Sequence, residues 1–307
     1  MDFMSTFNQI LVLFMMLMIG FVVRKLNIVD HTFSKNLSNF LFNIVFPATI
    51  IHSMIYPFSI DVLIDSIWLI VISLGVIVFS VIVAMVTIRF LNTDELSRNV
   101  YEFGIIFSNF GFMGFPVVQA LFGQEGIFYT SIFILPMRLL LNSLGIIIMS
   151  RGLGDRIKWN FKSFINPPVV SVLIGFFVFI FSIKFPQPIE MTISMVAATT
   201  APLSMILAGI LLATAKFSEM FSNYHVYIIS FIRLFFLPVC VLIVLRLFDL
   251  DLLMIGVPVI ITAMPMAANA SILAEKYNGN AYLGAQCVFI STLISIITIP
   301  LIVFLVL

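Results

Sequence analysis

The chain has 307 residues, of which 62% are hydrophobic and 9% are charged, and its formal net charge is +1. Soluble domains carry about 25% charged residues, so this composition excludes a soluble protein and indicates an integral membrane protein. A net charge so close to zero also predicts no nucleic-acid partner.

Ten apolar segments of helical length follow one another along the chain, separated by short connections. None has the ten-residue alternation of an outer-membrane β-barrel, so we expect an all-α integral membrane fold with ten transmembrane helices. The predicted spans are residues 3–23, 35–53, 66–88, 100–121, 127–149, 164–183, 190–213, 224–247, 252–274 and 281–306.

In the first half of the chain the basic residues follow spans 1, 3 and 5, whereas the connections after spans 2 and 4 contain none. The later connections carry one basic residue each and decide little. By the positive-inside rule the odd-numbered loops face the cytoplasm, which places both termini of this multi-pass cell-membrane protein outside. The residues that set this orientation are Arg24, Lys25, Lys35, Arg89, Arg98, Arg151, Arg156, Lys158 and Lys162. No Lys or Arg precedes the first span, so the N-terminus does not resemble a cleaved signal peptide.

A weak internal repeat relates the two halves at a shift of 155 residues, pairing Gly20 with Gly175 and Pro47 with Pro202. Each half carries five spans, and an odd number inserts the second half upside down relative to the first. We therefore expect two inverted five-helix repeats, at residues 1–153 and 154–307, which is a frequent plan of secondary transporters.

Two corresponding spans carry helix-breaking residues near their middles. Span 4 contains Ser108-Asn-Phe-Gly-Phe-Met-Gly-Phe-Pro116, and span 9 contains Ile261-Thr-Ala-Met-Pro-Met-Ala-Ala-Asn-Ala-Ser271. Glycine and proline weaken helices, and a backbone that opens at mid-membrane needs other partners for its polar groups. Paired interrupted helices in the two halves indicate a transporter binding site.

At these residues the chain resembles the auxin efflux carrier family, which includes plant PIN-type carriers and bacterial organic-acid permeases. The resemblance lies in Asn109 to Pro116, Leu121-Phe-Gly-Gln-Glu125, Asn166-Pro167, and Met264-Pro265 through Glu275-Lys-Tyr277. It implies a scaffold of spans 1, 2, 6 and 7 and a mobile transport domain of spans 3–5 and 8–10. It also implies broken spans 4 and 9 that cross at the substrate site, elevator-type movement and a homodimer. The absence of a long hydrophilic loop after span 5 favours a compact bacterial permease.

Two arginines, Arg138 and Arg233, lie near the middles of spans 5 and 8, and no Asp or Glu lies at comparable depth. Buried charges in membranes are costly and usually functional, and positive charge at mid-depth suits an anionic substrate. The alternative is that each arginine ties down backbone carbonyls between helices. The lack of a mid-depth carboxylate favours uniport, or coupling through backbone carbonyls, which a sequence does not reveal.

The remaining candidate substrate ligands are polar residues and prolines within apolar spans. Amides donate hydrogen bonds to carboxylates, although bonds between helices are the common alternative. Proline suits the first turn of a helix, so we expect two prolines to open the second halves of spans 4 and 9, where exposed N–H groups bind anions. With Arg138, the candidates are Asn109, Pro116, Asn142, Pro265, Asn269 and Ser271.

The sequence thus predicts a secondary transporter of a small organic anion, with that substrate and membrane lipid as its partners. Malate, malonate, another carboxylate and an indole acid remain open as substrates. The alternative is a membrane sensor or receptor that binds the same ligand without moving it. Cys240 and Cys287 stand alone, and no metal or cofactor motif or catalytic set is present, so neither a cofactor nor an enzymatic activity is expected.

Overall fold

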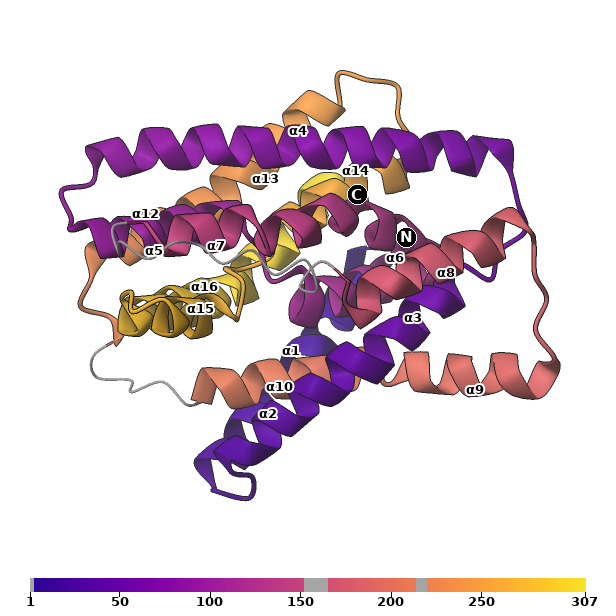
Figure 1. Cartoon of the computed structure of the whole chain (residues 1–307), viewed down its shortest axis with the longest axis horizontal. Coiled ribbons are helices and arrows are strands. Elements are labelled where there is room, and N and C mark those ends of the chain that lie inside the picture. Colours follow the sequence, from indigo (N-terminus) through magenta and orange to yellow (C-terminus); the bar gives the residue numbers. More distant parts are fainter. Residues whose placement is uncertain (1–2, 152–164, 214–219) are drawn as a thin grey trace. The chain divides into compact units, whose positions relative to one another are not determined.

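The computed structural model describes residues 3–151, 165–213 and 220–307, which are helical apart from connections and one isolated β-bridge (Figure 1). The helices form two compact units, each built from several stretches of the chain. The first comprises Met1–Ile70, Gly111–Leu135 and Phe161–Thr214, and the second comprises Val71–Phe110, Pro136–Asn160 and Ala215–Leu307. Both units draw on both halves of the chain, so they do not test the predicted repeat, whose boundary at 153/154 lies outside the described residues.

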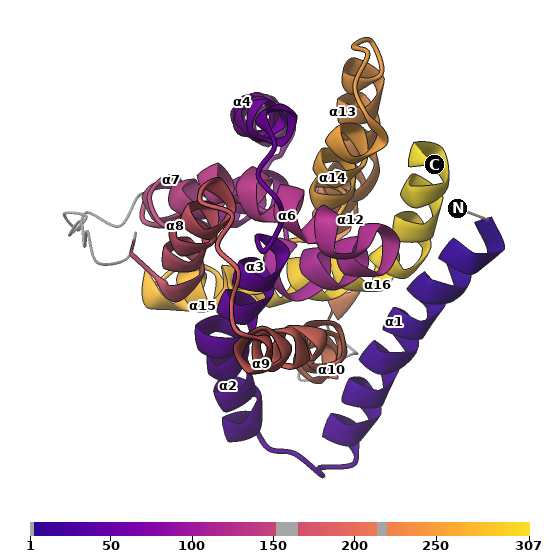
Figure 2. The same cartoon turned by 90° about the vertical axis from the view of Figure 1, so that its right-hand side faces the viewer.

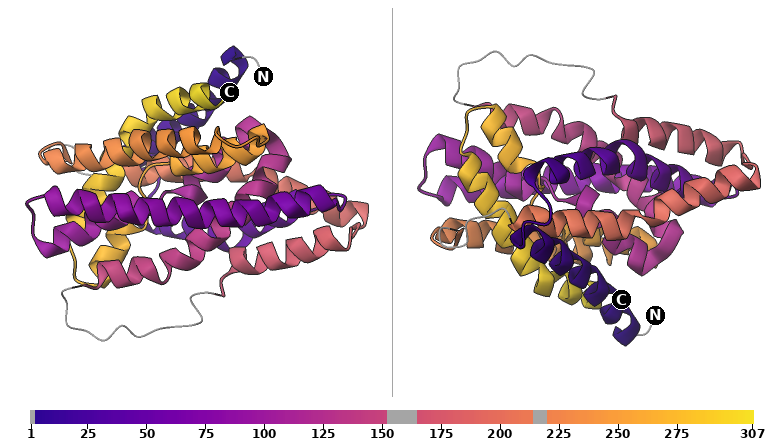
Figure 3. Two further views of the ribbon diagram at one scale, coloured as in Figure 1. Left: turned by 90° about the horizontal axis from the view of Figure 1, so that it is seen from above. Right: turned by 90° about the horizontal axis from the view of Figure 1, so that it is seen from below.

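Each of the ten apolar segments is helical over most of its described length. Six described helical stretches are long and apolar enough to cross a membrane, the shortest being Phe7–Lys25 with 19 residues. The longest single helix, α4 (Ile60–Phe90), has 31 residues and runs without interruption (Figure 3). The expected all-helical membrane protein is therefore confirmed, whereas ten crossings and an inverted repeat stay predictions.

The first unit contains α1 (Phe3–Lys25), α2 (His31–Phe40), α3 (Phe46–Ser53), α8 (Pro167–Ile180), α9 (Gln187–Ala198) and α10 (Thr200–Ala213). Its closest packing is the crossing of α1 with α10 (Figure 2). A Cβ on Gly20 would overlap the backbone of Ile206, and one on Gly209 would overlap the backbone of Leu17. Small residues let membrane helices approach in this way, so the two glycines set the distance of this crossing.

The second unit contains α5 (Glu95–Ile106), α7 (Leu144–Met149), α12 (Tyr224–Phe231), α13 (Leu237–Leu245), α14 (Leu252–Thr262), α15 (Ala270–Lys276) and α16 (Ala281–Val306). Within this unit α16 packs against α12, α14 and α15, and α5 packs against α7, α12, α15 and α16. The helix α6 (Phe115–Leu141) belongs to both units and is kinked at Gly123, whose φ of 63° and ψ of −147° are not helical.

Within the described residues, three helical turns of the π type interrupt the regular helices, at η1 (Leu41–Val45), η2 (Phe110–Gly114) and η4 (Ile232–Phe236). Each begins six residues before a proline, namely Pro47, Pro116 and Pro238. Proline has no N–H to donate to the preceding turn, and a widened turn changes the hydrogen-bond register there without ending the helix. Such turns are frequent at functional sites, and η4 carries Arg233.

Candidate functional site

Both helices that were expected to break are interrupted where the sequence carries glycine, proline and asparagine. The helix α5 ends at Ile106, and helical structure resumes at Phe110. The helix α14 ends at Thr262, and α15 begins only at Ala270. The backbone between these ends is extended or turned, so its N–H and C=O groups need partners other than a helical ladder.

The two interruptions supply those partners to each other within the second unit. Ser108 and Met266 face one another in an antiparallel bridge. The N–H of Asn109 donates to the carbonyl of Pro265 at 2.7 Å, and the N–H of Ala267 donates to the carbonyl of Phe107 at 3.0 Å. We call these paired segments, 107–109 and 265–267, the crossing.

A serine from a third helix completes the backbone pairing of the crossing. The N–H of Met266 donates to the Oγ of Ser291 on α16 at 3.2 Å, and that hydroxyl donates in turn to the carbonyl of Val288. Sequence reasoning did not single out Ser291. A serine in an apolar span usually bonds its own helix, so only the fold shows that this one also serves a neighbouring segment.

Arg233 holds both sides of the crossing through backbone carbonyls. Its side chain is 1% exposed. Nη1 donates to the carbonyls of Ile105 and Ile106, at 2.8 and 3.4 Å, and Nε donates to the carbonyl of Met264 at 3.2 Å. Its Nη2 is buried and has no hydrogen-bond partner among the described residues. Arg233 thus bonds backbone carbonyls of the two interrupted segments, which was the alternative expected for each arginine.

Arg138 lies beside the crossing on the last part of α6, where it is 6% exposed. Its guanidinium carbon lies 5.4 Å from the centre of the Phe110 ring, which directly follows Asn109 in the chain. An arginine over an aromatic face is held there by the electron-rich ring.

Only one of the two prolines lies where the sequence predicted. Pro265 is in the extended part of the crossing, five residues before α15, and its carbonyl accepts the hydrogen bond from Asn109. Pro116 is the second residue of α6 and follows the π-type turn η2, in the other compact unit. Pro116 therefore lies in the first turn of α6, as expected, although helical structure already resumes at η2. Pro265 lies in the bridged segment and does not open α15, so that part of the expectation is wrong.

The polar candidates differ in how near they lie to the crossing. Asn109 is part of it and buried, whereas Asn269 stands just before α15 and Ser271 lies in its first turn, both half-buried. Asn142 is in the turn between α6 and α7 and is half-buried. Ser108 is buried in the crossing, and its hydroxyl has no partner among the described residues.

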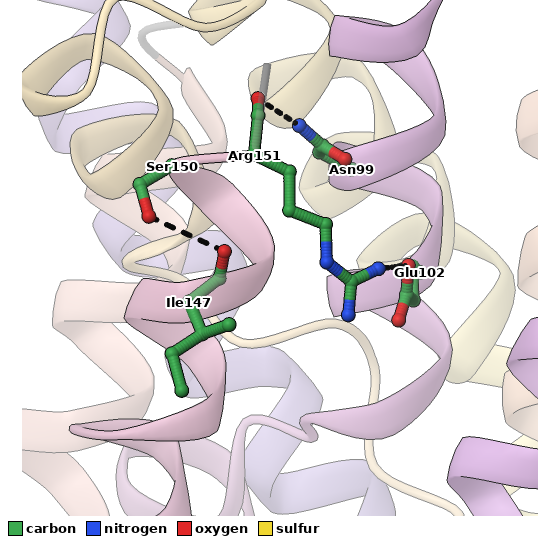
Figure 4. Close-up of polar contacts among 5 residues, drawn as sticks. All are labelled: Asn99, Glu102, Ile147, Ser150 and Arg151. Atoms are coloured by element: carbon green, nitrogen blue, oxygen red, sulfur yellow. Dashed lines mark hydrogen bonds and ion pairs between the residues drawn. The ribbon is translucent and has the colours of Figure 1, made fainter. Parts of the chain in front are cut away.

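A polar cluster joins α5 to Arg151, which follows α7 in the chain, as Figure 4 shows. Nη1 of Arg151 pairs with the Glu102 carboxylate at 2.6 Å, and the Asn99 amide donates to the Arg151 carbonyl at 3.0 Å. The Glu102 side chain is 3% exposed, and that of Arg151 is 45% exposed. At the start of α5 Asp94 accepts hydrogen bonds from Ser97, which hold the pKa of the Asp94 carboxyl below its ordinary value.

No group of three or more metal-ligating side chains occurs within residues 3–151, 165–213 and 220–307. Cys240 and Cys287 are both free cysteines. The buried chemistry around the crossing thus consists of arginines, amides, hydroxyls and backbone carbonyls, which are groups that bind anions or fix helices.

The chain matches a family model described as "Membrane transport protein" over residues 5–303. It is 25% identical over 305 residues to an uncharacterized transporter of Methanothermobacter thermautotrophicus, and the alignment covers 98% of both chains. It is 23% identical over 313 residues to an uncharacterized transporter of Methanocaldococcus jannaschii, covering 97% of this chain and 98% of that relative. Neither description states a substrate.

Proposed function

The chain belongs to the membrane transport protein family, the auxin efflux carrier family, and on that premise we propose that it moves a small organic anion by alternating access. Family membership makes it a multi-pass membrane transporter and not an enzyme. In this proposal the substrate is a carboxylate, and it binds at the crossing.

The single observation that carries this proposal is the set of partners around Arg233. Its described partners are three backbone carbonyls, which carry partial negative charge, and none of them is a carboxylate. Arg138 adds a second buried guanidinium, over the ring of Phe110. Buried Glu102 is paired with Arg151. A site with excess positive charge in an apolar surrounding favours an anionic ligand over a neutral or cationic one.

We assign the carboxylate contacts to side chains, because the crossing already uses the N–H groups of Asn109 and Ala267. Arg138 supplies a planar fork that matches a carboxylate, and the amides of Asn109 and Asn269 add neutral donors. The hydroxyl of Ser271 is a further donor in this proposal. Asn142 contributes less because it lies in a turn, and Pro116 contributes less because it lies in the first compact unit.

The proposed movement follows the family plan of ten crossings in two inverted repeats, with both termini outside and a homodimeric assembly. The first unit gathers the helices of the proposed scaffold of spans 1, 2, 6 and 7, namely α1, α2, α3, α8, α9 and α10. It also includes residues 111–135 of spans 4 and 5, so it supports the scaffold in part. The crossing belongs wholly to the second unit, as expected for a substrate site carried by an elevator-type transport domain.

Uptake of radiolabelled malate or malonate into proteoliposomes tests the proposal and separates a transporter from a sensor. Asn109→Ala and Asn269→Ala should each weaken anion binding about ten-fold, because each removes one donor to a charged group. Asn92→Ala is the matched control, since Asn92 is exposed between α4 and α5. Methyl esters of the acids should not compete with the radiolabelled acid. If an ester competes as well as the acid does, the crossing is not an anion site.

A further inference from the structure

The two half-helices that end at the crossing bring carbonyl oxygens together. Ile105 and Ile106 are the last residues of α5, and Met264 lies two residues beyond the end of α14. The last carbonyls of a helix have no partner within it, and they carry the partial negative charge of the helix dipole. Two such ends in one place attract a cation.

In transporters with broken helices, unwound carbonyls and half-helix C-termini are the groups that coordinate a coupling sodium ion. Here the corresponding carbonyls already accept hydrogen bonds from Arg233, at distances between 2.8 and 3.4 Å. The side chain is 1% exposed and is projected from the π-type turn η4, so it is part of the packed interior. A sodium ion would have to displace a buried arginine or lie against a like charge.

We propose that Arg233 is a built-in counter-cation of the crossing, which takes the place of a coupling sodium ion so that the anion is bound and moved without sodium. The inference rests on the proposed function and adds to it which group compensates the negative ends of the two half-helices at the site. Arginine stays protonated throughout the neutral range, so this cation neither leaves with the substrate nor releases a proton. Arg233 acts as a positioning residue, because it fixes the carbonyls of 105, 106 and 264.

The first test replaces sodium with N-methyl-D-glucamine at constant chloride and ionic strength and measures thermal unfolding of the full chain in detergent without any anion substrate. The parent protein should unfold at the same temperature in both salts. Arg233→Ala should lose stability and regain at least about 3 °C in sodium chloride, or in millimolar guanidinium, because an added cation then binds the vacated carbonyls. Arg138→Ala is the control and should respond to neither cation.

Two outcomes would overturn the proposal. One is a parent protein stabilised by sodium, which would mean that the carbonyls bind it despite Arg233. The other is an Arg233→Ala protein that recovers with neither sodium nor guanidinium. If Arg233→Ala does not fold, the parent measurement still decides, and Arg233→Lys, which keeps the charge, should fold and remain indifferent to sodium. Failure of malate to bind would count against the proposed substrate and leave these cation measurements unchanged.

Discussion

Asn109 and Pro265 are joined by a backbone hydrogen bond of 2.7 Å, although each lies in the middle of its own apolar segment. This bond and its neighbours turn two helix breaks into one paired structure, which Ser291 and Arg233 complete from α16 and η4. Each of these hydrogen bonds pairs a backbone N–H or C=O group at the crossing. Without a partner, such a group would be costly to bury in hydrocarbon. The breaks are therefore specific structures with defined partners.

Substituting Gly20 tests how tightly the first unit is packed. Gly20→Ala should lower the free energy of unfolding by about 1 to 3 kcal/mol, because its Cβ overlaps the backbone of Ile206 and neither helix can yield without moving. Gly75→Ala on α4 is the matched control, since nothing lies within 4 Å of a Cβ there, and it should be neutral or stabilising by up to about 1 kcal/mol. Thermal unfolding in one detergent measures both. Equal effects of the two variants would contradict the close approach of α1 and α10.

The sequence predicted the helices well because their signal is local. Apolar runs of helical length mark them, and the glycine, proline and asparagine of spans 4 and 9 mark the breaks. The pairing of Ser108 with Met266 was beyond prediction, because backbone hydrogen bonds between distant segments leave no trace in side-chain identity. The same reason hid the partners of Arg233, which are carbonyls that every residue possesses. Pro265 does not start a helix, although proline generally prefers helix starts, because it lies in the bridged segment. Its carbonyl accepts the hydrogen bond from Asn109 there.

Cysteine labelling tests the orientation, which stays a prediction. Gly123 in the connection after span 4 is unsuitable for a cysteine, because its φ of 63° strains any other residue. Exposed Glu125 and Asn92 serve instead. In a variant without native cysteines, Glu125→Cys should react with an impermeant maleimide in intact cells, and Asn92→Cys should react only after permeabilisation. The opposite pattern would reverse every span and refute the positive-inside assignment.

The ion pair between Glu102 and Arg151 should respond asymmetrically to loss of either partner. Arg151→Met leaves a carboxylate that is 3% exposed without its cation, and should cost about 3 kcal/mol of unfolding free energy. Glu102→Gln leaves an arginine that is 45% exposed and that water can solvate, so it should cost less. The double variant should recover part of the Arg151→Met loss. Thermal unfolding of the four proteins gives the coupling, and equal losses in the two single variants would mean that Glu102 is not buried as described.

Substitutions should distinguish Arg138, the proposed substrate ligand, from Arg233, the proposed positioning residue. Arg233→Gln removes a charged donor from three buried carbonyls, so it should reduce the yield of folded protein. Arg138→Gln should instead leave the folded yield largely intact and weaken malate binding by about ten-fold or more, because a charge-assisted contact with the substrate is lost. Arg138→Lys should restore binding only in part, since lysine keeps the charge beside Phe110 but lacks the planar fork. Binding to purified protein, normalised to its monodisperse fraction in gel filtration, distinguishes the two effects. If Arg138→Gln folds poorly and yet binds malate normally once recovered, Arg138 is structural and the anion is held by other donors.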